Sequence, residues 1–229
     1  MKLTPRLQTI ANMVDKGSII GDIGTDHAYL PVWLVENSIC ERAFATDINE
    51  GPLANAVGTI EEAGFSDQIT TRLGGGIEPY HLGEANAYVI AGMGGMLIID
   101  ILTTSKELAD LADYLILQPM QGRADLRKWL SENAYEILEE RIAIEGEKFY
   151  EVIKVKAGKG THMTWAETEL GTSMLQDENY YEFLDHKIRV HERILAGVKK
   201  GNDQAAISRV EAELKAIEEV KSCALTQKR

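Results

Sequence analysis

Short apolar runs alternate with stretches of helical spacing from Ser18 to about Lys156. This alternation is typical of a parallel β-sheet with helices on its faces. Strands are predicted over seven segments: Ser18–Asp22, Arg42–Thr46, Ile69–Leu73, Ala87–Ala91, Tyr114–Gln118, Tyr135–Ile144 and Phe149–Lys156. Helices are predicted over Leu3–Met13, Tyr29–Asn37, Pro52–Ala63, Gly95–Thr103 and Gly122–Glu132. The last two strands are separated by only a few turn-forming residues, so we expect them to pair as an antiparallel hairpin.

The pattern changes after the glycine-containing joint at 158–160. Apolar or aromatic residues then recur every three or four positions in two series, Tyr181 to Val198 and Ile207 to Ile217, with turn residues between them at 201–203. This spacing predicts two helices folded back on each other. We therefore expect a domain of residues 1–160 and a helical hairpin domain of residues 161–229.

The first strand ends in an acidic, glycine-containing turn, DIGTDHAYLP, at residues 22–31. Gly24 lets the backbone approach a ligand closely, and the start of the next helix offers unpaired N–H groups. A dinucleotide site would have a second glycine where Asp26 stands, and this carboxylate would repel a pyrophosphate. The turn therefore favours a cationic ligand such as a sulfonium over NAD, although a purely structural turn would also fit.

Three more strand ends carry candidate ligand contacts. Asp47 follows the second strand, where a carboxylate can accept both ribose hydroxyls of a nucleoside or simply cap the next helix. Glycine loops follow the third strand at 74–76 and the fourth at 92–95, leaving bare backbone for a ligand at the carboxyl edge of the sheet.

The segment after the fifth strand, LQPMQGR, adds polar and basic groups. Gln118 could contact the edge of a base, and Arg123, Arg127 and Lys128 could reach phosphates. Taken singly, each of these three cations is better explained by a solvated helix face.

The motifs DIGTDHAYLP, ATDIN, IAGMGG and LQPMQG occur in this order, followed by a short helical extension. In this combination the chain strongly resembles the bacterial tRNA (adenine-22-N1)-methyltransferase family known as TrmK. The resemblance implies an α/β fold, with a Rossmann-like class I methyltransferase sheet and a small coiled-coil-like helical domain. It also implies S-adenosylmethionine as methyl donor and tRNA as substrate.

The resemblance implies roles for individual residues. The expected cofactor-binding residues are Asp22, Gly24, Asp26, Ala28, Tyr29, Asp47, Ile48, Asn49, Gly74, Gly75, Gly92 and Met93. The expected catalytic group is Asp26, His27, Gly94 and Gln118, with the first two beside the transferring methyl group and the others bordering the target base. His27 could instead cap the following helix. Gly75 stands where many such enzymes carry Asp or Asn, so backbone groups are expected to recognise the adenine of the cofactor.

The charge of the chain is unfavourable for an RNA partner at first sight. Among 229 residues there are 24 Lys and Arg against 36 Asp and Glu, a net charge of −12. Affinity for nucleic acid comes largely from cations that release counterions from phosphates. One helix of the extension nevertheless carries a basic stripe, His186, Arg189, Arg193 and Lys200, at spacings of three, four and seven, although a solvated helix face would also explain it. We expect RNA contacts from Lys187, Arg189, Arg193 and Lys200 as well as from Arg123, Arg127 and Lys128.

Other classes of function remain open at this point. They are a class I methyltransferase acting on another RNA, a small molecule or a protein, an NAD-linked oxidoreductase, and a non-catalytic binding protein. The two cysteines and five histidines have no metal-ligand spacing, so no metal is expected. No apolar run is long enough for a membrane span and no signal peptide is recognisable, so a cytoplasmic protein is expected.

Overall fold

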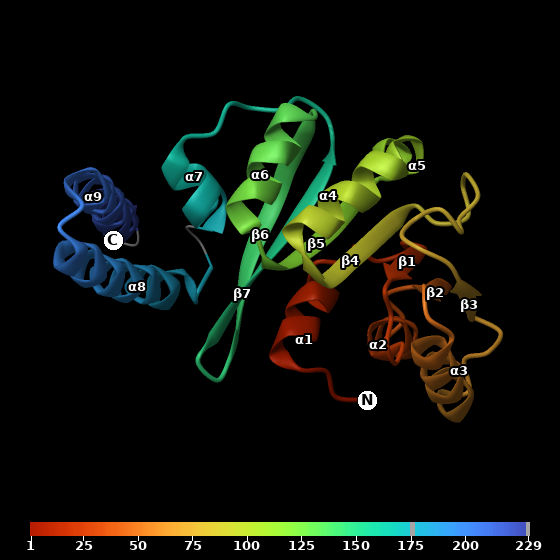
Figure 1. The fold of residues 1–229 in the computed structure, drawn as a ribbon. Helices are drawn as coiled ribbons and strands as arrows, with labels where there is room; N and C mark the ends of the chain where they lie inside the picture. The colour runs from red at the N-terminus through yellow and green to blue at the C-terminus, as the bar shows by residue number, and fades with distance from the viewer. Residues whose placement is uncertain (175–176, 228–229) are drawn as a thin grey trace. The chain divides into compact units, whose positions relative to one another are not determined.

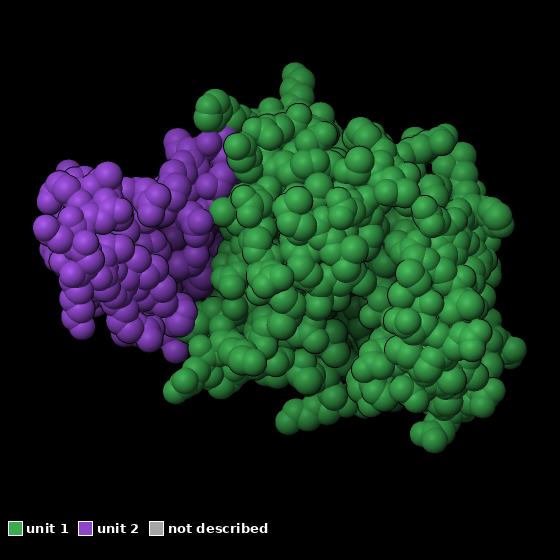
Figure 2. Space-filling model, viewed as in Figure 1, with its two compact units in different colours: residues 1–162 green, residues 163–229 purple. Residues whose placement is uncertain are grey.

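The computed structural model describes residues 1–174 and 177–227. The chain divides into two compact units, residues 1–162 and 163–229 (Figure 2). None of the helices in the described part of the chain has the length and apolar content needed to cross a membrane.

Seven strands form one sheet in the first unit (Figure 1). They are β1 (Ile20–Ile23), β2 (Ala43–Asp47), β3 (Ile69–Leu73), β4 (Ala87–Gly94), β5 (Tyr114–Gln121), β6 (Tyr135–Glu145) and β7 (Lys148–Ala157). Their spatial order is β3-β2-β1-β4-β5-β7-β6, with β1 to β5 parallel and the β6–β7 hairpin antiparallel at one edge. The sequence prediction of five parallel steps followed by a hairpin is confirmed.

Helices cover both faces of this sheet. They are α1 (Pro5–Asn12), α2 (Tyr29–Glu36), α3 (Glu50–Ala63), α4 (Gly95–Thr104), α5 (Lys106–Leu111) and α6 (Arg123–Glu132). Strand β4 shows how the two cores arise, because side chains alternate across a strand. Ala87 and Val89 pack in the core beneath α1, α2 and α3, whereas Tyr88 and Ile90 pack in the core beneath α4, α5 and α6.

Two features of the first unit differ from the prediction by more than a shift of two residues at an element boundary. Strands β4 and β5 run three residues further than expected, because they resume pairing beyond an irregularity between Ala91 and Met93. Helix α5 was not predicted, since six residues are too few to show a helical period.

The second unit contains α7 (Trp165–Leu170), α8 (Tyr180–Gly201) and α9 (Gln204–Gln227). Helices α8 and α9 pack against each other, and Asn202 between them adopts the left-handed conformation that ends the first helix. Both helices carry buried side chains, among them Phe183, Leu184, Val210 and Ile217. The predicted helical hairpin is thus confirmed.

Candidate active site

A cavity of about 450 Å³ opens at the carboxyl ends of the parallel strands. The strand order reverses between β1 and β4, and ligands of open α/β sheets bind outside the strand ends at such a point. Eight of the residues expected to bind a cofactor line this cavity: Gly24, Asp47, Ile48, Asn49, Gly74, Gly75, Gly92 and Met93.

The turn after β1 is fixed against β2. The backbone N–H groups of Gly24 and Thr25 both donate to the carbonyl oxygen of Thr46, at 2.8 and 2.9 Å. Gly24 has a φ of +74°, and a Cβ atom there would overlap the terminal methyl group of Met93. A larger residue would therefore suffer both backbone strain and a clash with the opposite wall of the cavity.

Asp47 is held in place at the end of β2. Its Oδ1 accepts a hydrogen bond from the backbone N–H of Asn49 at 2.8 Å, and its carbonyl oxygen accepts one from Gly74 N–H at 2.9 Å. The carboxylate thus stabilises the start of the following turn and still lines the cavity. Its other oxygen, Oδ2, can accept from a ligand hydroxyl.

The cavity wall is acidic. Asp47, Glu78 and Asp100 line it, and the described residues of its lining include no Lys or Arg. Such a wall attracts a cationic ligand and repels a pyrophosphate, because like charges at short range are unfavourable. This electrostatic character agrees with the preference deduced from Asp26 in the sequence.

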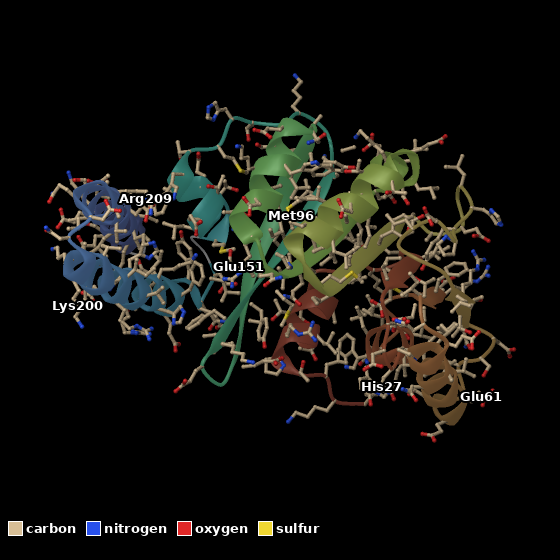
Figure 3. All side chains as sticks on the ribbon, viewed as in Figure 1. His27, Glu61, Met96, Glu151, Lys200 and Arg209 are labelled. Atoms are coloured by element: carbon tan, nitrogen blue, oxygen red, sulfur yellow. The ribbon has the colours of Figure 1, made fainter. Side chains whose placement is uncertain are left out.

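Sequence reasoning missed the side of the cavity formed by α4. Leu97, Asp100, Ile101 and Thr104 line it from one face of this helix. Their spacing of three, one and three residues is a helical signal that could have been found. Ligand contacts in an open α/β sheet are expected first at the strand ends, and these residues lie within a helix. Met96, at the start of the same helix, is exposed (Figure 3).

Asp22 is buried at the end of β1 and is not part of the cavity lining. Burial raises the pKa of its carboxyl group to about 6, against the opposing effects of a hydrogen bond with Thr25 and the positive charge of Arg6. A proton on this group near neutral pH is therefore much more favourable than on an ordinary aspartate.

Asp26, His27 and Tyr29 lie next to the cavity in sequence but outside its lining. The rings of His27 and Tyr29 stack with centroids 5.0 Å apart, and His27 Nε2 lies 3.4 Å from Asp26 Oδ2. All three side chains are at least partly exposed; His27 is labelled in Figure 3. His27 does not cap α2, because the helix start has no side-chain cap and Thr25 accepts the hydrogen bond from Ala28 N–H.

Ala28 itself is fully buried and has a φ of +51°. Its methyl group cannot contact a ligand in the cavity. Its backbone is equally inaccessible, and Ala28 is not among the residues that line the cavity, so the structure shows no surface of this residue that could contact a cofactor.

Gln118 does not reach a substrate base, which corrects the sequence expectation. Its side chain is completely buried, and Oε1 accepts hydrogen bonds from Gly92 N–H at 3.1 Å and Arg6 Nη1 at 2.9 Å. Its Nε2 donates to the Pro119 carbonyl oxygen. Gln118 therefore contacts the loop that was expected to border the base, and this loop includes Gly94 at the start of α4.

The expectation that Arg127 contacts phosphate is also wrong, because this residue is not accessible to RNA. Its side chain is fully buried and its guanidinium pairs with Glu140 and with Glu151 of β7, at 2.7 Å each. Glu151 is labelled in Figure 3. Arg123 pairs with Glu151 at 3.0 Å and keeps part of its side chain exposed. Lys128 is mostly exposed, 4.0 Å from Glu132.

The cations of α8 differ in exposure. Arg189, Arg193 and Lys200 are exposed, and the two arginines border a shallow depression together with Glu192. Lys200 lies near the end of this helix (Figure 3). Lys187 is largely buried and pairs with Glu169 at 3.0 Å, so this lysine is a structural contact within the second unit rather than a free phosphate ligand.

Comparison with known proteins agrees with this geometry. A family model described as a methyltransferase domain matches residues 3–153. The tRNA (adenine(22)-N(1))-methyltransferase of Bacillus subtilis is 41% identical over 158 residues, which span 69% of this chain and 66% of that protein.

Solved structures match nearly the whole chain. The crystal structure of the B. subtilis M1A22 tRNA methyltransferase TrmK has a TM-score of 0.83 and 31% identity, covering 96% of this chain and 99% of that one. The Streptococcus pneumoniae protein Sp1610, solved in complex with S-adenosyl-L-methionine, has a TM-score of 0.85 and 30% identity, covering 96% and 100%.

Proposed function

This chain belongs to the tRNA (adenine-22-N1)-methyltransferase family, TrmK, and we propose that it transfers the methyl group of S-adenosylmethionine to N1 of adenine 22 in tRNA. The observation that carries the proposal is the acidic, glycine-lined cavity at the switch point of the sheet, in a chain with this family membership.

The residues of the cavity suit S-adenosylmethionine. Oδ2 of Asp47 is placed to accept from ribose hydroxyls, and exposed Ile48 offers an apolar surface to the adenine ring. The glycines at 74–76 let the backbone approach that ring without a side chain between them. Bound there, the cofactor supplies a methyl group activated by its sulfonium.

The chemistry requires little from ionisable side chains. The ring lone pair of adenine N1 forms the new bond to carbon as the carbon–sulfur bond breaks, and no proton has to leave the nucleophile. Catalysis then depends on orientation and on exclusion of water, which the loop of Gly92 to Gly95 can provide. We infer that Asp26 and His27 lie beside the reacting groups when both substrates are bound.

Adenine N1 lies on the Watson–Crick edge, so the target base must be unpaired or turned out of its stack before it reacts. We infer that exposed Arg189, Arg193 and Lys200 contact tRNA phosphates, with Lys128 and the exposed part of Arg123 contributing from the first unit. This assigns residues 161–229 a role in tRNA binding. Such a substrate also suggests a cytoplasmic location.

The test is a methylation assay with labelled S-adenosylmethionine and unmodified transcribed tRNA, followed by mapping of the modified nucleotide. Methylation at N1 of adenine 22 is expected. A transcript with guanosine at position 22 serves as the matched control and should remain unlabelled. Label on another nucleotide, or on protein or small molecules in place of tRNA, would overturn the assignment.

A further inference from the structure

Arg6, on the first turn of α1, is bound to three parts of the first unit that are distant in sequence. Its backbone N–H donates to Glu145 Oε1 at 2.8 Å, and its guanidinium carbon lies 5.8 Å from the centre of the Tyr150 ring. Its Nη1 donates to Gln118 Oε1 at 2.9 Å. The β6–β7 hairpin thus fixes α1 and the arginine, while the tip of the side chain reaches the active-site edge of the sheet.

Gly92 depends on a side chain for its hydrogen bond. It has a φ of +77° and falls in the irregularity where β4 leaves its regular pairing with β5. Its N–H donates to the same Oε1 atom of Gln118 that accepts from Arg6. Gly92 and Met93 line the cavity, so this bond holds part of the cavity wall.

The orientation of the Gln118 carboxamide decides whether this bond can form. In the observed orientation its oxygen meets two donors, and its Nε2 donates to the Pro119 carbonyl oxygen. The opposite orientation would place an NH₂ group against both the Gly92 N–H and a positive charge. A charged donor strengthens a hydrogen bond, and it does so most in a buried site such as this one.

We propose that Arg6 is a positioning residue for methyl transfer: it fixes the Gln118 side chain, which in turn holds Gly92 and the adjacent cavity wall. Arg6 acts through Gln118 and does not touch the RNA. The inference rests on the proposed function for its catalytic consequence, whereas its structural consequence can be measured without turnover.

The experiment compares Arg6→Met, Arg6→Lys, Gln118→Leu and the double variant R6M/Q118L. Gln8→Ala is the control, because Gln8 is on the same helix and bonds Asn12 on its exposed side. Amide exchange at Gly92, measured by NMR, should be roughly tenfold faster in Arg6→Met and in Gln118→Leu. The double variant should exchange no faster than Gln118→Leu alone. In Arg6→Lys the exchange rate of the Gly92 amide should lie between the rates of the wild type and Arg6→Met.

The kinetic arm measures kcat and KM with tRNA. Arg6→Met and Gln118→Leu should each lower kcat about tenfold and change KM for tRNA less than about twofold, with non-additive effects in the double variant. If Gln118→Leu fails to fold, the comparison of Arg6→Met with Arg6→Lys decides whether Arg6 is a positioning residue.

Three results would overturn the proposal: unchanged Gly92 exchange in Arg6→Met, multiplicative losses in the double variant, or a raised KM for tRNA at unchanged kcat. A wild-type protein that leaves tRNA unmethylated would instead refute the proposed function. The exchange measurement would still decide the role of Arg6.

Discussion

At the scale of single residues, the ionisable groups at the carboxyl end of β1 differ sharply in environment. Asp22 is buried and its pKa is raised to about 6, whereas Asp26, four residues later, is exposed. The carboxyl group of Asp22 therefore affects stability, whereas that of Asp26 is accessible to a substrate. Each position leads to a separate prediction.

Replacing Asp26 by alanine should lower methyl transfer by at least about a hundredfold, because a group beside the reacting atoms orients them. The thermal midpoint should stay within a few degrees, since the side chain is exposed. Asp67→Ala, an equal charge change in the exposed turn before β3, is the matched control in the same assay. Near-normal turnover of Asp26→Ala would remove Asp26 from the site.

Replacing Asp22 by asparagine should stabilise the protein at pH 7 by up to roughly 3 kcal/mol, because the buried carboxylate must otherwise be ionised against its raised pKa. The folded state binds the proton more tightly than the unfolded state, so the wild type loses stability as the pH rises from about 4 to about 6. Chemical unfolding of both proteins across pH 4 to 7.5 checks this. The stability difference should vanish near pH 4, and a pH-independent difference would contradict the assignment.

At the scale of elements, α4 and α6 begin where two glycine backbones meet. A Cβ atom on Gly95 would overlap the carbonyl oxygen of Gly122, and Gly122 has a φ of +68°. The two helices pack side by side on one face of the sheet (Figure 1). This close approach fixes the start of α4, and α4 supplies one side of the cavity.

Gly95→Ala should therefore destabilise the protein by about 1–3 kcal/mol, because backbone atoms must move to admit the methyl group. Gly58→Ala is the contrasting variant. Gly58 lies inside α3, and a methyl group added there would meet no described atom within 4 Å, so alanine should stabilise by about 0.5–1 kcal/mol. Thermal unfolding measures both, and equal effects of the two changes would refute the packing argument.

At the scale of the whole molecule, the net charge of −12 is unevenly distributed. Residues 1–160 carry 14 basic and 24 acidic side chains, whereas residues 161–229 carry 10 and 12. In the second unit Lys199 pairs with Glu211 and Lys187 with Glu169, while Arg189 and Arg193 are exposed. An acidic protein can thus still present cations to a polyanion.

Arg189→Gln together with Arg193→Gln should weaken tRNA binding and lower the slope of log affinity against log salt by about 1.5, as expected for two lost phosphate contacts. Affinity for S-adenosylmethionine should not change. The control is the double variant Arg209→Gln with Lys215→Gln, on the exposed side of α9. It removes the same charge, but both of its cations have glutamate neighbours. An unaltered salt slope in the α8 variant would exclude these arginines from the RNA interface.

The sequence alone predicted the seven strands and the longer helices in their order, the terminal hairpins of both units, and most of the strand-end residues that line the cavity, but not the six-residue helices α5 and α7. It could do so because periodicity and turn residues are local properties of the chain. The folded structure was needed to show that Arg127 and Gln118 are buried, that one side of α4 completes the cavity, and that Arg6 reaches Gln118 across 112 positions. The partners of these side chains are remote in sequence, and burial and hydrogen bonding are settled only when the chain packs.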